Sequence, residues 1–249
     1  MKLGGHILSL DRSSPIPLYL QLEEILKNKI ENKELLPHQA IPSENELGKQ
    51  FNLSRMTVRN VITRLVGEGL LYRVPGKGTF VAEPKITTAP ITQMGIREQL
   101  EEMGYETETT VIDKKIEKAT EKVSEILHIP IGAPVYILER LRYANNEPLS
   151  LHISYIPVEL CSGLLEKDIE SIPLCNILDS DYQIIAKRGT ETLETIGAGP
   201  REAKLLEIKK GFPLLLLTYV MYSQEDIPFE YSKVVFRGDR IKLKFEFHR

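Results

Sequence analysis

The sequence contains no tryptophan and only two cysteines, Cys161 and Cys175, among its 249 residues. Two cysteines do not make the disulfide framework of a small secreted protein, and a reducing cytoplasm fits them better. No uninterrupted apolar run approaches the ~20 residues of a membrane-spanning helix, and residues 1–10 lack the ending of a cleaved secretory signal. We therefore expect a cytoplasmic protein with no membrane partner.

Groups with the spacing needed for catalysis or metal binding are also missing. The five histidines and two cysteines show no metal-ligand spacing, so neither a metal nor another cofactor is expected. The Gly76–Thr79 stretch is not a P-loop, because the preceding spacing is wrong and no helix is expected after it. No nucleophile–base pair stands out, so we expect no catalytic residues and no enzyme.

The net charge of −3 is distributed unevenly along the chain. Residues 1–85 hold twelve Lys and Arg against nine Asp and Glu, whereas the remainder holds twenty against twenty-six. Residues 49–78 contain six basic side chains and one acidic side chain, Glu68. A local basic cluster of this kind indicates a nucleic-acid partner more strongly than the charge of the whole chain does.

The first 81 residues read as three helices followed by a small hairpin. Apolar residues recur at helical spacing after Pro17, and this helix should end before Pro37. Ser43 and Glu46 have the spacing of a capping box, and Ser54 is placed to cap a third helix. Two short strands should flank a turn at residues 75–78, and residues 82–90 read as a linker.

The remainder, residues 91–249, contains more hairpin signals than strand–helix–strand units. Strands are expected at 107–116, 135–144, 149–157, 184–196, 214–222, 229–236 and 241–247, and helices at 96–103, 120–127, 173–178 and 200–206. This pattern predicts an antiparallel sheet with helices on one face. The whole chain is therefore expected to be α+β, with two domains.

Two short helices across a tight turn form a helix-turn-helix arrangement. The second helix presents Arg55, Thr57, Arg59 and Asn60 away from its apolar side, with Arg64 further along. The major groove of DNA admits one helix, and an arginine there can read a guanine. Ser43 and Ser54 are placed to hold phosphates. The alternative is an ordinary three-helix core whose basic face is simply solvated.

The residues 17–81 resemble the winged-helix DNA-binding domain of the GntR family of bacterial transcription regulators. The resemblance is carried by Pro17-Leu18-Tyr19, Ile41-Pro42-Ser43-Glu44, Ser54–Arg59, residues 65–71 and the glycine-flanked Lys77 before Thr79-Phe80-Val81. It implies a homodimer on a palindromic operator in double-stranded DNA. By motif position, Arg55, Thr57 and Arg59 should reach bases, Tyr19, Ser43 and Glu44 should support or touch the backbone, and Lys77 with Gly78 should enter the minor groove.

The residues from about 91 to the end resemble the UTRA effector domain of the HutC-type branch of this family. The resemblance is carried by residues 140–148, 152–157, 211–215, 228–232 and 236–240. It implies a chorismate-lyase-like antiparallel sheet that binds a small molecule without catalysing a reaction. In the loop after the linker, where members of this branch often place a small hydroxyl residue to hold a phosphate, this chain has Gly95 and Arg97. Phe236 stands where a tyrosine is frequent, so one hydroxyl contact is absent.

Arg140 and Arg142 are two residues apart on one expected strand, so they share a face. Two guanidiniums on one face repel unless an anion lies between them, which favours a phosphate or carboxylate ligand. The alternative is that they pair with Glu139, Glu147 or Glu230 on an exposed face. Glu230 can otherwise accept from ligand hydroxyls or pair with an ammonium group. The predicted effector-binding set is Gly95, Arg97, Arg140, Arg142, His152, Glu230 and Phe236.

These features predict a DNA-binding transcription regulator, a repressor released by an anionic effector such as a sugar phosphate. Two other classes remain open at this point. One is an enzyme of an anionic metabolite with a DNA-localising head, although the acid–base–nucleophile set that it needs is missing around the two arginines. The other is a non-specific architectural DNA binder, which does not need an acidic partner domain.

Overall fold

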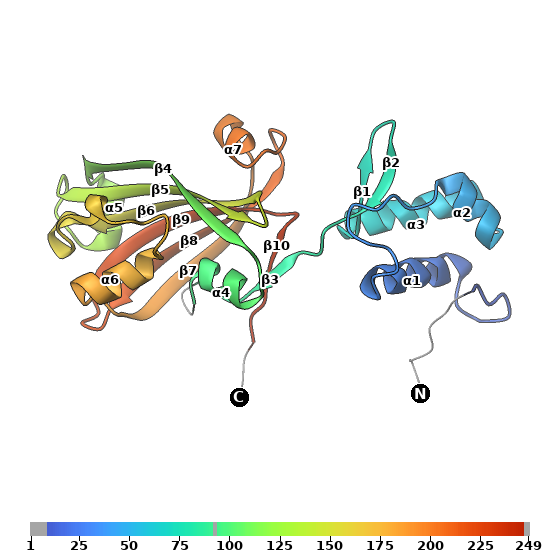
Figure 1. Cartoon of the computed structure of the whole chain (residues 1–249), viewed down its shortest axis with the longest axis horizontal. Coiled ribbons are helices and arrows are strands. Elements are labelled where there is room, and N and C mark those ends of the chain that lie inside the picture. Colours follow the sequence, from blue (N-terminus) through green and yellow to red (C-terminus); the bar gives the residue numbers. More distant parts are fainter. Residues whose placement is uncertain (1–8, 92–93, 247–249) are drawn as a thin grey trace. The chain divides into compact units, whose positions relative to one another are not determined.

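The computed structural model describes residues 9–91 and 94–246, and the chain divides into two compact units. The first unit comprises Met1–Pro84 and the second Lys85–Arg249. Figure 1 labels the helices and strands of both units. No helix within the described ranges is long and apolar enough to cross a bilayer.

The first unit has the three helices and the hairpin that the sequence predicts. Its elements are α1 (Leu18–Glu31), α2 (Glu44–Phe51), α3 (Arg55–Gly67), β1 (Leu71–Val74) and β2 (Gly78–Val81). The apolar sides of the helices and the first and last residues of the hairpin close over one core, which includes Leu22, Leu47, Val58, Ile62 and Leu65. The winged helix-turn-helix fold is thereby confirmed.

The ends of α2 and α3 follow the expected capping chemistry. Ser43 and Glu46 form a complete capping box at the start of α2. Asn52 ends this helix in the left-handed conformation, with φ of 51°. Ser54 then caps α3 by accepting a hydrogen bond from the Thr57 amide at 3.1 Å. The turn between the two helices is consequently short and well defined.

The second unit is built on a six-stranded antiparallel sheet with strand order β4-β5-β6-β9-β8-β7. Its strands are β4 (Thr107–Lys118), β5 (Pro134–Ala144), β6 (Glu147–Pro157), β7 (Ala186–Gly197), β8 (Pro213–Ser223) and β9 (Pro228–Arg237). Its helices are α4 (Ile96–Glu102), α5 (Glu121–Leu127), α6 (Leu174–Tyr182) and α7 (Pro200–Leu205), with two short 3₁₀ turns, Val158–Leu160 and Leu164–Glu166. The antiparallel sheet and the α+β class are as predicted.

The helices cover both faces of this sheet, which corrects the expectation of one covered face. Leu138 of β5 points to one face of the sheet and packs with α6. Val135 and Leu141 point to the other face, where Val135 packs with α5 and Leu141 with the turn after α7. The physical reason is the burial of β5, which is nearly continuous rather than alternating. A strand with two apolar faces requires a cover on each side.

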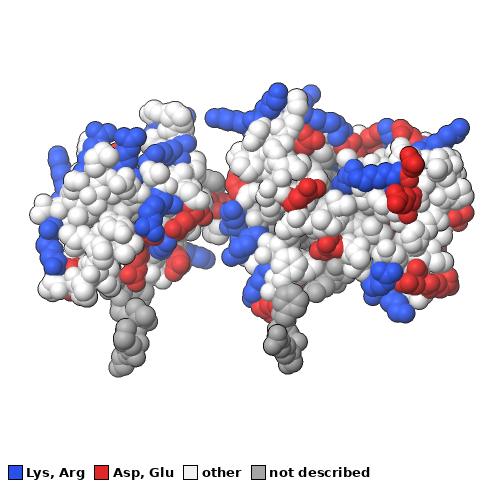
Figure 2. Space-filling model, turned by 180° about the vertical axis from the view of Figure 1, so that it is seen from behind, with Lys and Arg blue, Asp and Glu red and all other residues white. Residues whose placement is uncertain are grey.

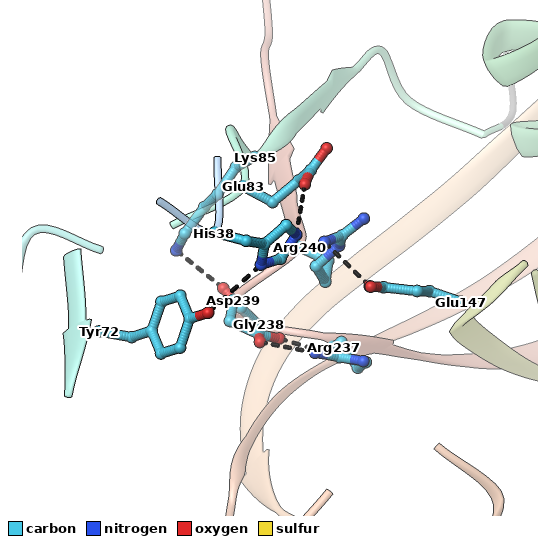
Figure 3. A network of polar contacts seen from close by, with 9 residues as sticks. All are labelled: His38, Tyr72, Glu83, Lys85, Glu147, Arg237, Gly238, Asp239 and Arg240. Atoms are coloured by element: carbon cyan, nitrogen blue, oxygen red, sulfur yellow. Dashed lines mark hydrogen bonds and ion pairs between the residues drawn. The ribbon is translucent and has the colours of Figure 1, made fainter. Parts of the chain in front are cut away.

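The segment expected to be a linker contains a strand. β3 (Ile86–Thr88) pairs in parallel with β10 (Ile241–Leu243) in a separate two-stranded sheet. Lys85 Nζ also donates to the carbonyl oxygen of Gly238 at 2.8 Å, as Figure 3 shows. Backbone pairing across 155 residues of sequence is invisible to local patterns. β10 is shorter than predicted, and Phe247 at the expected end lies outside the described residues.

One buried amide ties helix α4 to the segment that follows β3. Gln99 has an exposed fraction of only 4%. Its Oε1 accepts from the Ala89 amide at 2.7 Å, and its Nε2 donates to the carbonyl oxygens of Met94 at 2.6 Å and Ala89 at 3.3 Å. These bonds satisfy backbone groups that have no partner in a helix or strand.

Replacing Gln99 by leucine should therefore destabilise the second unit by about 1–3 kcal/mol, because three partly buried backbone groups lose their partners. Urea denaturation of the full chain measures the change. Gln50→Leu, at an exposed position of α2, is the matched control and should leave stability nearly unchanged. A Gln99→Leu variant as stable as the wild type would show that the amide does not hold this segment.

Candidate functional site

The predicted DNA-contacting residues gather on α3 and on the hairpin tip of the first unit. Arg55, Arg59 and Asn60 are exposed on α3, whose buried residues are Val58, Val61, Ile62 and Leu65. Lys77 is exposed at the tip between Gly76 and Gly78, whose φ angles are +75° and +129°. On the face drawn in Figure 2, Lys and Arg side chains spread over this unit.

The hydroxyl groups of this surface are held by caps within the unit. Ser43 Oγ lies 2.7 Å from Glu46 Oε2, and Ser54 Oγ lies 2.8 Å from Thr57 Oγ1. Any phosphate or base contact from these residues is made by side chains whose orientation is already set by the helix ends. This arrangement reduces the conformational entropy that these side chains lose when they bind DNA.

Arg64 of α3 lies next to Tyr19 of α1. The Arg64 guanidinium is 3.2 Å from the nearly buried carboxylate of Glu23 on α1 and 5.9 Å from the centroid of the Tyr19 ring. Glu23 also pairs with Lys27 at 2.9 Å. Arg64 therefore joins α1 to α3, a role that the sequence did not predict, and a DNA contact from it remains a prediction.

The second unit contains a cavity of about 500 Å³ against the sheet, under α4 and α6. Six of the seven predicted effector-binding residues line it: Gly95, Arg97, Arg140, Arg142, His152 and Glu230. Residues from α6 and from the neighbouring strands complete the wall. Within the described parts of the chain, no three His, Cys, Asp or Glu side chains are grouped to hold a metal ion.

Arg140 and Arg142 are buried on the cavity wall, with exposed fractions of 4% and 6%. Neither forms an ion pair with a described residue, and the Nε atom of each is buried without a hydrogen-bond partner. Two of the three carboxylates named as alternatives are engaged elsewhere, because Arg201 binds Glu139 and Arg240 binds Glu147. Burial, with Arg140 and Arg97 nearby, lowers the pKa of Arg142 to about 9.

Glu230 faces these arginines through a chain of hydroxyl groups. Arg140 Nη2 donates to Ser154 Oγ at 2.7 Å, and Ser154 donates to Glu230 Oε1 at 2.9 Å. Ser232 and Tyr219 approach the same carboxylate oxygen at 2.6 and 3.0 Å. Burial and the Glu230 charge raise the pKa of Tyr219, so its hydroxyl remains a donor. The network orients Arg140 without neutralising it.

Arg97 and Gly95 lie at the start of α4. The Arg97 guanidinium already has partners, since its Nε donates to Glu101 at 2.7 Å and its Nη1 to the Glu170 carbonyl oxygen at 3.0 Å. Gly95 precedes the first residue of the helix, and a Cβ there would collide with the Glu98 carboxylate. Glu98 in turn accepts a hydrogen bond from the Cys175 thiol of α6 at 3.2 Å.

His152 lines the cavity, and Phe236 packs against its ring from behind. Their rings meet edge to face with centroids 6.1 Å apart, and His152 Nε2 lies 2.9 Å from Ser150 Oγ. Phe236 is completely buried behind the cavity wall and does not line it, which corrects its prediction as a direct contact. The physical reason is that its apolar ring packs into the core with α4.

Sequence reasoning missed the polar residues that support the arginines. Ser154, Ser232 and Tyr219 belong to the network, and Glu98 and Cys175 connect α4 with α6 across the cavity. A detectable signal existed on β6, where Ser150, His152 and Ser154 alternate on a strand that is otherwise apolar. Polar residues with period two on a buried strand indicate a polar site inside the fold.

The buried imidazole gives a pH dependence that can be measured. Burial, with Arg142 and Arg140 nearby, holds the pKa of His152 well below 6.5, so the folded state keeps it neutral while the unfolded state binds a proton. Stability should fall below pH 6.5 by up to about 1.4 kcal/mol per pH unit. Urea denaturation at pH 5.5 and 7.5 should show this loss in the wild type and in the control His128→Asn, but not in His152→Gln. Equal pH dependence in all three would contradict the account.

Comparison with known proteins agrees with this geometry. Residues 18–81 match the family of bacterial regulatory proteins named gntR, and residues 102–242 match the UTRA domain. The first match spans α1 to β2, and the second begins at the end of α4 and includes the whole six-stranded sheet. The first matched region holds the basic helix, and the second holds the strands of the cavity wall, whereas Gly95 and Arg97 precede it.

Relatives and solved structures cover nearly the full chain. The HTH-type transcriptional repressor NagR of Bacillus subtilis is 37% identical, over 94% of this chain and 96% of its own length. The probable fructoselysine utilization operon transcriptional repressor of Escherichia coli strain K12 is 31% identical over 95% and 97%. The crystal structure of PhnF from Mycobacterium smegmatis superposes with a TM-score of 0.65 at 27% identity, over 93% and 99%.

One relative is named as a transcriptional repressor and the other as a probable one, and each aligns with this chain over both units. The basic helix-turn-helix unit and the cavity on the antiparallel sheet are the two parts that such a regulator requires. The chain is a DNA-binding transcription regulator of the GntR family, and it carries the UTRA domain of the HutC-type branch.

Proposed function

We propose that the chain is a repressor that binds a palindromic operator as a homodimer, with α3 in the major groove and the hairpin tip at the adjacent minor groove. The support is the exposed row of Arg55, Arg59 and Asn60 on a helix with a capped start, together with the thin glycine-flanked tip at Lys77. Of the relatives described above, one is named as a repressor and the other as a probable one. Two such heads reach successive major grooves when half-sites lie about 34–36 Å apart.

Replacing Arg59 by alanine should reduce the preference for operator over random duplex by about 1–3 kcal/mol, because a bidentate arginine–base contact is lost. The operator is obtained by selection from a randomised duplex library, and fluorescence anisotropy measures both affinities. Lys29→Ala, on α1, is the control and should keep the preference. An unchanged preference in Arg59→Ala would show that α3 does not read bases through this residue.

The second unit is proposed to bind a small anionic effector that releases the DNA. The observation that carries this proposal is the pair of buried guanidiniums, Arg140 and Arg142, on the cavity wall with no ion-pair partner among the described residues. A phosphate or carboxylate between them removes the repulsion and accepts charge-assisted hydrogen bonds. The Cys175 thiol on the same wall is hydrogen-bonded to Glu98, but burial and the Glu98 charge raise its pKa to about 12, so it stays protonated and binding rather than turnover fits the site.

The rest of the cavity favours a ligand with hydroxyl or amino groups. Glu230, Asn176 and Asp179 line it together with apolar side chains such as Leu174 and Met221. Carboxylates and amides at fixed positions accept hydrogen bonds from a polyol, while the apolar part covers its carbon skeleton. We therefore infer a sugar phosphate or a related acidic metabolite, a class consistent with a relative named for fructoselysine utilization.

Regulation requires that the effector bind two states of the dimer unequally. An effector with equal affinity for the DNA-bound and the free state shifts nothing, whatever its affinity. We propose that occupancy of the cavity favours a state with lower operator affinity, and by linkage that operator DNA lowers the affinity for the effector by the same factor.

Replacing Arg142 by glutamine should give a folded protein that holds its operator but is no longer released by the effector. Folding should be retained because the lowered pKa of Arg142 shows that its charge is unfavourable where it lies. Anisotropy of the labelled operator during titration with hexose 6-phosphates and short carboxylates measures release. Arg188→Gln, at an exposed position of β7, is the control. Release of Arg142→Gln at wild-type concentrations would refute the anion site.

A further inference from the structure

The carboxylate of Glu44 lies between two arginines from different elements of the first unit. Its Oε2 is 3.3 Å from Nε of Arg55 at the start of α3, and its Oε1 is 3.6 Å from Nη2 of Arg73 on β1. Arg55 belongs to the predicted DNA-contacting set, whereas nothing in the family motif singled out Arg73. The shared carboxylate brings α2, α3 and the hairpin together at one point.

Arg73 is also attached directly to α3. Its Nη2 donates to Thr63 Oγ1 at 3.0 Å. Arg55, Arg59 and Thr63 follow one another at intervals of four residues, so they lie along one side of the helix. The guanidinium of Arg73 therefore rests beside the same row that is proposed to face DNA, and its side chain is still 40% exposed.

The place of Arg73 between helix and tip suggests a function. With α3 in the major groove and Lys77 at the adjacent minor groove, the phosphate strand that separates the two grooves must pass between them. Arg73 stands on β1, the strand that leads from α3 to the tip, and its side chain leans onto α3. We propose that Arg73 contacts this phosphate strand, positioned by Thr63 and Glu44.

The charges at this point fit that role. A guanidinium has five N–H donors, and Thr63 accepts the one hydrogen bond that Arg73 forms within the described residues. The remaining donors are available to phosphate oxygens. An acidic side chain beside DNA repels phosphate, so Glu44 is useful there only if it holds Arg55 and Arg73 in orientation. Glu44 is accordingly a positioning residue, and Arg73 is the contact.

The proposal rests on the groove assignment of the proposed function, and its test separates the two. Full-length wild type, Arg73→Gln and Arg73→Lys are titrated with the library-selected duplex and with a shuffled duplex, between 50 and 200 mM KCl. Loss of one phosphate contact should reduce the slope of log affinity against log salt by about 0.9 for each bound protomer. Raising KCl from 50 to 200 mM weakens binding by a certain factor in the wild type, and this factor should be about 3.5-fold smaller in Arg73→Gln for each bound protomer.

The Gln variant should lose affinity for both duplexes by a similar factor, and the Lys variant should keep the wild-type slope because it keeps the charge. Lys29→Gln makes the same charge change on α1 and should not alter the slope. A wild-type slope in Arg73→Gln, even with weaker binding or a lower melting temperature, would reduce Arg73 to a structural role and overturn the proposal. If the wild type enriches no sequence from the library, the groove assignment itself fails.

Discussion

Two guanidiniums buried side by side, with no carboxylate bound directly to either among the described residues, are the constraint on which the second unit depends. Arg140 and Arg142 point from one strand into one cavity, and each has a buried Nε without a partner. A charge out of water is costly unless it is paired, so the fold carries an unfavourable feature that the proposed anionic ligand would relieve. The proposed effector would gain binding energy by pairing with these guanidiniums.

The surroundings hold these charges in place while leaving them available. Ser154 and Glu230 orient Arg140 through hydroxyl groups, and the lowered pKa of His152 keeps a third cation out of the site. The first unit uses the same principle, since Ser54 bonds Thr57 and Glu44 pairs with Arg55 before any DNA is present. Both sites are pre-organised, which lowers the entropy cost of binding.

Local patterns in the sequence were sufficient for most of the helices and strands and for the two arginines of the cavity wall. Capping at Ser43 and Ser54 and the period-two placement of Arg140 and Arg142 are short-range features, and the structure shows them as predicted. The pairing of β3 with β10 and the cover on both faces depend on contacts distant in sequence. Phe236 was wrongly predicted to contact the ligand. The alternation of side chains along a strand shows which face of the sheet a residue occupies, but neither it nor the family motif shows whether the residue reaches the cavity.

We infer that the second unit contains an anion site made by Arg140 and Arg142, which have no ion-pair partner among the described residues. Its most direct test is the melting temperature of the full chain in increasing inorganic phosphate, compared with chloride at equal ionic strength and repeated with Arg140→Ala. The account predicts a saturable rise with phosphate in the wild type alone. A phosphate curve that coincides with the chloride curve, or a rise that survives in Arg140→Ala, would contradict it.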